Sequence, residues 1–200
     1  MIKKAKKGEL QLKKAMIFIS FFLFVLLTAC DKEASQNSQD QTDEIGNPVV
    51  VLGDGEAPNE ILFIFDYSCP YCHDWLLEFE KQIREWAEEG TIQFRAQSIA
   101  ALNEQSREWA KIEQNIKRLY PSEYYDFLFD LMRNEGESIG KLAAKYHMGN
   151  KIFDDPRVDP DDVTDFYKKE YHMESVPAVF VHGKKVEDSF SLEEIQTLMK

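Results

Sequence analysis

Cysteine and positive charge are both scarce in this chain. Three cysteines in 200 residues cannot form the framework of a disulfide-rich secreted domain. Lysine and arginine number 24 against 36 aspartates and glutamates, so the formal net charge is −12. This charge argues against nucleic acid as a partner, because binding it requires a basic face that neutralises phosphates. Hydrophobic residues make up 44% of the chain, which is enough for the core of one ordinary domain.

Long apolar runs are also rare, and the clearest covers residues 15–29, after a lysine-rich start. As a helix it would reach about 22 Å, less than the roughly 30 Å hydrocarbon core of a bilayer. A basic start, a short apolar run and a small-residue end are typical of a secretory signal peptide. The end reads Leu27-Thr28-Ala29-Cys30 and resembles the bacterial lipobox, in which the cysteine is acylated and becomes the first mature residue.

We therefore predict a lipoprotein signal peptide over residues 1–29 and lipidation of Cys30. Acyl chains would hold the protein on the extracytoplasmic face of a bacterial cell membrane. The alternative is an uncleaved membrane anchor in which Cys30 has no role. Residues 30–47 are rich in Asp, Glu, Ser, Gln and Asn, which predicts a disordered tether before a domain over 48–200. This tether is too short for an N-terminal dimerisation domain, so we expect a monomer.

The start of the domain has the pattern of a βαβ unit. Residues 61–65 form a continuous apolar run, as in a strand that is covered on both faces. Apolar residues then recur every three or four positions over 70–89, which predicts an amphipathic helix that ends at Gly90. Alternation over 92–97 predicts the next strand, and residues 49–52 are a further short strand candidate.

The second half of the domain is richer in helix. Four apolar stripes predict helices between about residues 101 and 174, with Ser122 as a cap of the second. Asp159 and Pro160 have the pattern of a cap and a first helical residue for the fourth. Strand patterns return at 178–181 before a last helix. The alternation of strands and helices predicts an α/β fold.

Cys69 and Cys72 form a Cys-Pro-Tyr-Cys motif between the apolar strand and the amphipathic helix. Cys69 would lie at the helix N-terminus, where unpaired N–H groups and the helix dipole favour a thiolate. Cys72 would lie one turn further, within reach of a disulfide. Because a thiolate of low pKa is a good leaving group, such a disulfide passes easily to a substrate. We predict that Cys69 is the exposed nucleophile and that Cys72 is the shielded resolving thiol.

Other roles for the pair stay open. A structural zinc site needs four ligands, and the chain has no second Cys-x-x-Cys. A static disulfide that closes so short a loop would stabilise the fold little. A lipid-anchored copper chaperone is a further alternative, since soft thiolates select Cu(I). We expect neither a metal site nor a cofactor, because the four histidines are scattered: His73, His147, His172 and His182.

The active-site segment resembles that of the DsbA-like thioredoxin-fold proteins. Its residues are Phe65-Asp66-Tyr67-Ser68-Cys69-Pro70-Tyr71-Cys72. The likeness extends from about Pro48 to the C-terminus and implies a thioredoxin-like fold with a helical insertion between the βαβ and ββα units. It also implies a protein thiol–disulfide oxidoreductase, with a cis Pro177 facing the disulfide and with Val176 and Pro177 as the edge that binds substrate peptides. The implied partners are exported protein thiols or disulfides and a membrane redox protein that recycles the pair.

Two positions depart from this family. Phe63 stands where many relatives bury an acid beneath the second cysteine, so Asp66, His73 or water would have to accept the proton of Cys72. Tyr71 replaces the histidine of the family prototype, so we expect a pair less oxidising than the extreme of about −120 mV. The sequence predicts oxidation or exchange of disulfides in secreted proteins. A reductase, for example in cytochrome maturation, is the alternative.

Overall fold

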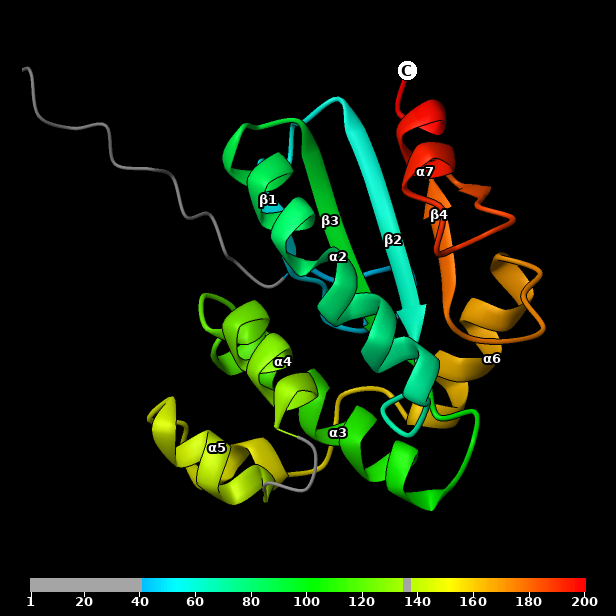
Figure 1. Ribbon diagram of the computed structural model, residues 1–200. Coiled ribbons are helices and arrows are strands. Elements are labelled where there is room, and N and C mark those ends of the chain that lie inside the picture. The colour runs from blue at the N-terminus through cyan, green and yellow to red at the C-terminus, as the bar shows by residue number, and fades with distance from the viewer. Residues whose placement is uncertain (1–40, 135–137) are drawn as a thin grey trace, which may run out of the picture. The chain divides into compact units, whose positions relative to one another are not determined.

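A computed structural model describes residues 41–134 and 138–200 (Figure 1). The predictions for the signal peptide and for Cys30 lie outside these residues. The described part contains a five-stranded sheet of order β1-β3-β2-β4-β5. Its strands are β1 (Val51–Gly53), β2 (Asn59–Phe65), β3 (Ile92–Ser98), β4 (Ala178–Val181) and β5 (Lys184–Lys185). β2 and β3 run parallel, whereas the other neighbouring strands are antiparallel.

The helices are placed as the sequence predicts, with one helix inside the βαβ unit and several helices between β3 and β4. They are α2 (Pro70–Glu88), α3 (Glu104–Leu119), α4 (Tyr124–Arg133), α5 (Ile139–Lys145), the 3₁₀ helix η1 (Asn150–Phe153), α6 (Pro160–Glu170) and α7 (Leu192–Leu198). In Figure 1, α2 crosses the sheet over β2 and β3. None of the helices in the described residues is both long and apolar enough to cross a membrane.

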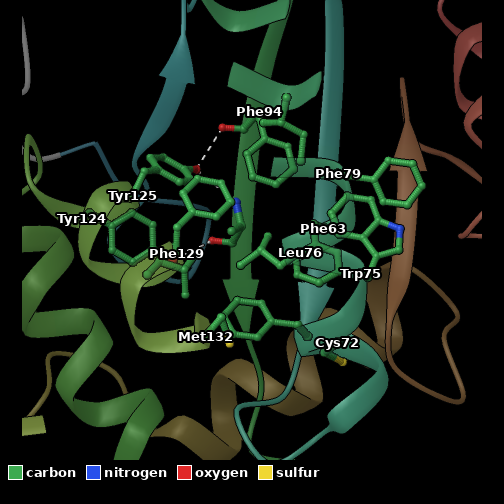
Figure 2. Close-up of a cluster of buried hydrophobic side chains, with 14 of the residues drawn as sticks. Phe63, Cys72, Trp75, Leu76, Phe79, Phe94, Tyr124, Tyr125, Phe129 and Met132 are labelled. Atoms are coloured by element: carbon green, nitrogen blue, oxygen red, sulfur yellow. Dashed lines mark hydrogen bonds between the residues drawn. The ribbon is translucent and has the colours of Figure 1, made fainter. Parts of the chain in front are cut away.

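Both faces of β2 are buried, which explains its continuous apolar sequence. On one face, Phe63 stacks on Trp75 of α2 with ring centroids 4.2 Å apart, within the larger hydrophobic core (Figure 2). On the other face, Leu62 packs in a smaller core with Val163 and Tyr167 of α6. Because successive side chains of a strand point to opposite faces, one apolar run supplies both cores.

The helix starts show where local sequence signals hold and where they do not. The prediction for α6 is confirmed, because the Asp159 side chain accepts a hydrogen bond from the Asp161 amide and Pro160 is the first helical residue. The prediction that Ser122 caps α4 is wrong. Glu123 precedes the helix, and its amide already donates to the Tyr120 carbonyl at 3.2 Å in a preceding turn.

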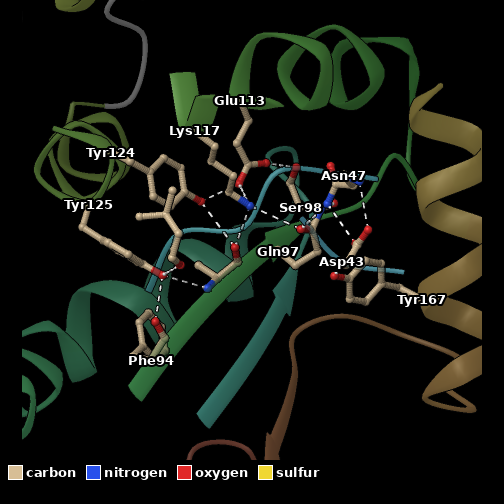
Figure 3. A network of polar contacts seen from close by, with 12 residues as sticks. Asp43, Asn47, Phe94, Gln97, Ser98, Glu113, Lys117, Tyr124, Tyr125 and Tyr167 are labelled. Atoms are coloured by element: carbon tan, nitrogen blue, oxygen red, sulfur yellow. Dashed lines mark hydrogen bonds and ion pairs between the residues drawn. The ribbon is translucent and has the colours of Figure 1, made fainter. Parts of the chain in front are cut away.

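The expectation of a disordered tether is wrong for residues 41–47, which fold against the domain (Figure 3). Asn47 is fully buried, and its amide group donates to Gln97 Oε1 at 2.9 Å. Tyr167 donates its hydroxyl to Asp43 Oδ2 at 2.9 Å. Polar composition alone predicts that residues 41–47 are solvated. The side chains of Asp43 and Asn47 instead form hydrogen bonds with polar groups inside the fold.

Candidate active site

The two cysteines of the motif lie at the N-terminus of α2, directly after β2. Cys69 is the N-cap residue, and its amide donates to the Asp66 carbonyl at 3.0 Å. Pro70 takes the first helical position, where its missing N–H leaves no hydrogen bond unmade. The Cys72 amide donates to Cys69 Sγ at 3.3 Å. This amide also donates to the Cys69 carbonyl at 3.0 Å, so one amide of the first turn is shared between the sulfur and the carbonyl oxygen of Cys69.

The two thiols differ in burial and in acidity. Both are free cysteines, and Cys69 is 5% exposed while Cys72 is fully buried. The expectation of an exposed Cys69 is thus wrong in degree, because only a small part of this residue reaches solvent. A hydrogen bond from the Cys72 side chain is the main reason that the pKa of Cys69 falls to about 7. Burial raises the pKa of Cys72 far above its ordinary value.

The Val176–Pro177 segment approaches the first thiol from the far end of the chain. The Val176–Pro177 peptide bond is cis, as the family resemblance implies. Cys69 Sγ lies 3.8 Å from the Val176 carbonyl oxygen. The structure thus brings Cys69, Cys72 and Val176 together, and their catalytic and substrate-binding roles stay predictions.

The surroundings of Cys72 are apolar where relatives carry an acid. Phe63 is fully buried and stacks on Trp75, as Figure 2 shows. The two side chains suggested as proton acceptors both make other bonds. His73 Nε2 donates a hydrogen bond to the Tyr67 carbonyl oxygen at 2.8 Å. The Asp66 carboxylate accepts hydrogen bonds from four donors.

A polar cluster beside the active-site loop is the feature that sequence reasoning missed. Ser106 donates its hydroxyl to Asp66 Oδ1 at 2.5 Å, although the two residues are 40 positions apart. Asn103 caps α3 by accepting from the Ser106 amide at 3.0 Å. The spacing of Asn103 and Ser106 is a helix-cap signal, which predicts the start of α3 but not its proximity to Asp66.

We find no cluster of three or more His, Cys, Asp or Glu side chains that could hold a metal ion within residues 41–134 and 138–200. A protonated Cys72 beside an acidic Cys69 suits stepwise thiol exchange, in which one sulfur reacts with a partner and the second releases it.

The family of the chain follows from its match to a family model. A model described as Thioredoxin matches residues 46–200. The chain belongs to the thioredoxin family. Together with the dithiol at the start of α2, this membership makes the protein a thiol–disulfide oxidoreductase, and the predicted DsbA-like, thioredoxin-like α/β fold is confirmed. No curated protein sequence matches the chain.

Solved structures share the fold at low sequence identity. Oxidised BdbD from Bacillus subtilis is 19% identical with a TM-score of 0.57, and the match covers 78% of this chain and 91% of that protein. A thioredoxin-like oxidoreductase from Silicibacter pomeroyi is 17% identical with a TM-score of 0.62, over 75% and 89% of the two chains. MdbA, a thiol-disulfide oxidoreductase from Corynebacterium diphtheriae, is 17% identical with a TM-score of 0.54, over 72% and 84%.

The acidity of Cys69 leads to a prediction for its reaction with alkylating agents. Because only the thiolate reacts, the alkylation rate of the reduced protein should rise with pH and reach half of its plateau near pH 7. Cys72 should stay unmodified up to pH 9, because its pKa is raised by burial. Iodoacetamide labelling, followed by mass spectrometry of the peptide containing both cysteines, measures both rates. A midpoint near 8.5, the ordinary cysteine pKa, would contradict the assignment.

Proposed function

We propose that this protein oxidises the thiols of exported proteins on the outer face of a bacterial membrane. The observation that carries the proposal is the lowered pKa of Cys69 at the N-terminus of α2. A stabilised thiolate stabilises the reduced pair, and this makes the disulfide form a better oxidant. In each cycle a substrate dithiol would lose two electrons and two protons, and the Cys69–Cys72 disulfide would be reduced to two thiols. A membrane redox protein would then reoxidise the pair.

The surroundings of Cys69 support a protein substrate. The Val176 carbonyl next to the sulfur is a backbone acceptor that an extended peptide could reach. Tyr71 is 68% exposed within the motif, and Leu102 is 54% exposed just before the Asn103 cap of α3. Such side chains would give a partly unfolded substrate apolar contacts beside the reacting sulfur.

A reductase is the second candidate function, and the pKa of Cys69 is also the observation that favours it. A Cys69 pKa of about 7 is close to that of thioredoxin and lies well above the roughly 3.5 of the most oxidising member of the family. Equilibration of the purified protein with glutathione separates the two roles. We expect a potential above about −180 mV, whereas a potential near −270 mV would favour a reductase.

The proposed membrane attachment depends on Cys30. Cys30→Ala should release the protein from the membrane fraction or leave it as an unprocessed precursor, because acyl chains are the proposed anchor. Fractionation of cells and the mass of the mature N-terminus measure this. Asp31→Asn, which leaves the cysteine intact, is a matched control and should still be acylated. A Cys30→Ala protein that matures normally and stays in the membrane would contradict the lipoprotein hypothesis.

A further inference from the structure

A buried carboxylate, Asp66, lies between the active-site motif and the helical insertion. Asp66 is fully buried, three residues before Cys69. Its carboxylate accepts four hydrogen bonds. The donors are the Ser68 amide at 2.8 Å, the Ser106 hydroxyl at 2.5 Å, the Ala101 amide at 2.8 Å and the Leu102 amide at 3.0 Å. These donors bind both carboxylate oxygens, so the side chain has little freedom to rotate.

Three of the four bonds connect segments that are distant in sequence, because only Ser68 belongs to the same loop as Asp66 and Cys69. Ala101 and Leu102 lie in the loop before α3, and Ser106 lies in its first turn. A further hydrogen bond reinforces the connection, because the Ser68 hydroxyl donates to Asn103 Oδ1 at 3.1 Å. Loss of the Asp66 carboxylate would therefore loosen the active-site loop on one side.

The negative charge of the same carboxylate acts on both thiols. The Asp66 carbonyl accepts a hydrogen bond from the Cys69 amide at 3.0 Å, and this bond fixes the backbone of Asp66 against the reacting residue. The Cys72 side chain is the main cause of the acidity of Cys69, and Asp66 opposes it electrostatically, raising the pKa of Cys69. The charge also raises the pKa of Cys72, for which burial is the main cause. A buried charge is screened far less by water and salt than a surface charge.

We propose that Asp66 is a positioning residue that fixes the Cys69 loop to the start of α3 and that its charge makes the Cys69–Cys72 disulfide a weaker oxidant. The charge destabilises the thiolate form of the reduced pair and leaves the uncharged disulfide almost unaffected. The balance between reduced and oxidised protein therefore moves toward the disulfide. The inference rests on the thiol chemistry of Cys69 and not on the direction of exchange in the cell.

Asp66→Asn tests the effect of the charge. The amide oxygen can still accept from Ala101 and Leu102, and the amide nitrogen can donate to the Ser106 hydroxyl. The Ser68 amide loses its acceptor, so three of the four contacts survive. We expect the pKa of Cys69 to fall by roughly one unit when the negative charge is removed. At pH 7 this shifts the equilibrium with glutathione about fivefold toward the reduced protein, or about 20 mV.

Ser106→Ala is the matched control, because it removes one hydrogen bond of Asp66 and keeps the charge. It should lower the melting temperature but leave the equilibrium with glutathione within about twofold of wild type. All variants are made in the full-length protein with Cys30→Ser, so that Cys69 and Cys72 are its two remaining thiols. Iodoacetamide rates against pH give the pKa of Cys69, and glutathione equilibration gives the potential.

An unchanged equilibrium in a folded Asp66→Asn protein would overturn the proposal, as would an equal shift in Ser106→Ala. Asp66→Ser is a second neutral variant, and failure of both neutral variants to fold would also overturn it, because Asp66 would then be a folding requirement and not a modulator of the thiol. The wild-type potential tests the proposed oxidising role, whereas the difference between the variants tests Asp66. The two failures are thus distinguishable.

Discussion

Replacement of Cys72 by serine should turn the protein into a covalent trap for its substrates. Cys69 would still attack a substrate disulfide, forming a mixed disulfide and releasing one substrate thiolate. No second thiol would then be present to release the partner. The serine hydroxyl can keep the hydrogen bond that lowers the pKa of Cys69, so the remaining sulfur should stay reactive. Mixed disulfides with exported proteins should appear on a non-reducing gel and disappear with dithiothreitol.

The opposite replacement, Cys69→Ser, should trap little. Its remaining thiol, Cys72, is fully buried, and burial raises its pKa. At pH 7 about half of Cys69 is thiolate, whereas a thiol with a pKa of 8.5 or more is ionised by only a few per cent. We therefore expect at least about tenfold more adducts from the Cys72→Ser protein.

The third cysteine of the chain makes a control necessary. A protein with both Cys69→Ser and Cys72→Ser keeps Cys30, and any adducts that it forms measure the background from that residue. Equal adduct levels from the two single variants, or adducts mainly through Cys72, would contradict the assignment of nucleophile and resolving thiol. If neither variant traps a partner above background, metal binding by the pair becomes the better hypothesis.

The parts of the fold that sequence predicts are those set by local patterns. The run from Ile61 to Phe65 is apolar on both faces because both cores need it, and the stripe of α2 is the buried face of a single helix. The position of Cys69 follows from the same boundary between strand and helix. Such signals lie within one or two turns of chain, where spacing and side-chain type determine the structure.

Contacts across long sequence separations were not predictable in the same way. Asp43 and Asn47 have the composition of a solvated linker, and only the position of Gln97 and Tyr167 shows why they are ordered. Asp66 was a candidate proton acceptor, and its role changes once Ser106 is found beside it. A polar side chain in a sequence does not reveal its partner, because the partner is set by the tertiary fold.

A buried ion pair on α3 also makes contacts with parts of the chain outside its helix. Glu113 and Lys117 are both 2% exposed at their side chains, with 2.9 Å between Lys117 Nζ and Glu113 Oε1 (Figure 3). Lys117 also donates to the Ala96 carbonyl at 2.8 Å, and Glu113 accepts from the hydroxyls of Ser98 and Tyr124. Burial lowers the pKa of Lys117, and the neighbouring carboxylate opposes this change. The pair thus joins α3 to β3 through Ser98 and Ala96, and to α4 through Tyr124.

Lys117→Met should destabilise the protein by about 3–5 kcal/mol, because it leaves the charge of Glu113 buried without its cation. For a domain of this size the melting temperature should fall by roughly 6–20 °C. Thermal and urea unfolding followed by circular dichroism measure both quantities. The methionine keeps most of the apolar volume of the lysine, so the loss reports the charge and its hydrogen bonds more than a cavity.

Lys111→Met is the matched control on the same helix. Lys111 pairs with Glu108 at 2.7 Å, but their side chains are 31% and 50% exposed, so this change should alter the stability by less than about 1 kcal/mol. Glu113→Gln combined with Lys117→Met removes both buried charges and should be more stable than Lys117→Met alone, because no unpaired ion remains. If the Lys117→Met and Lys111→Met proteins unfold at the same denaturant concentration, water must reach the buried pair, and its proposed role in fixing α3 to β3 is wrong.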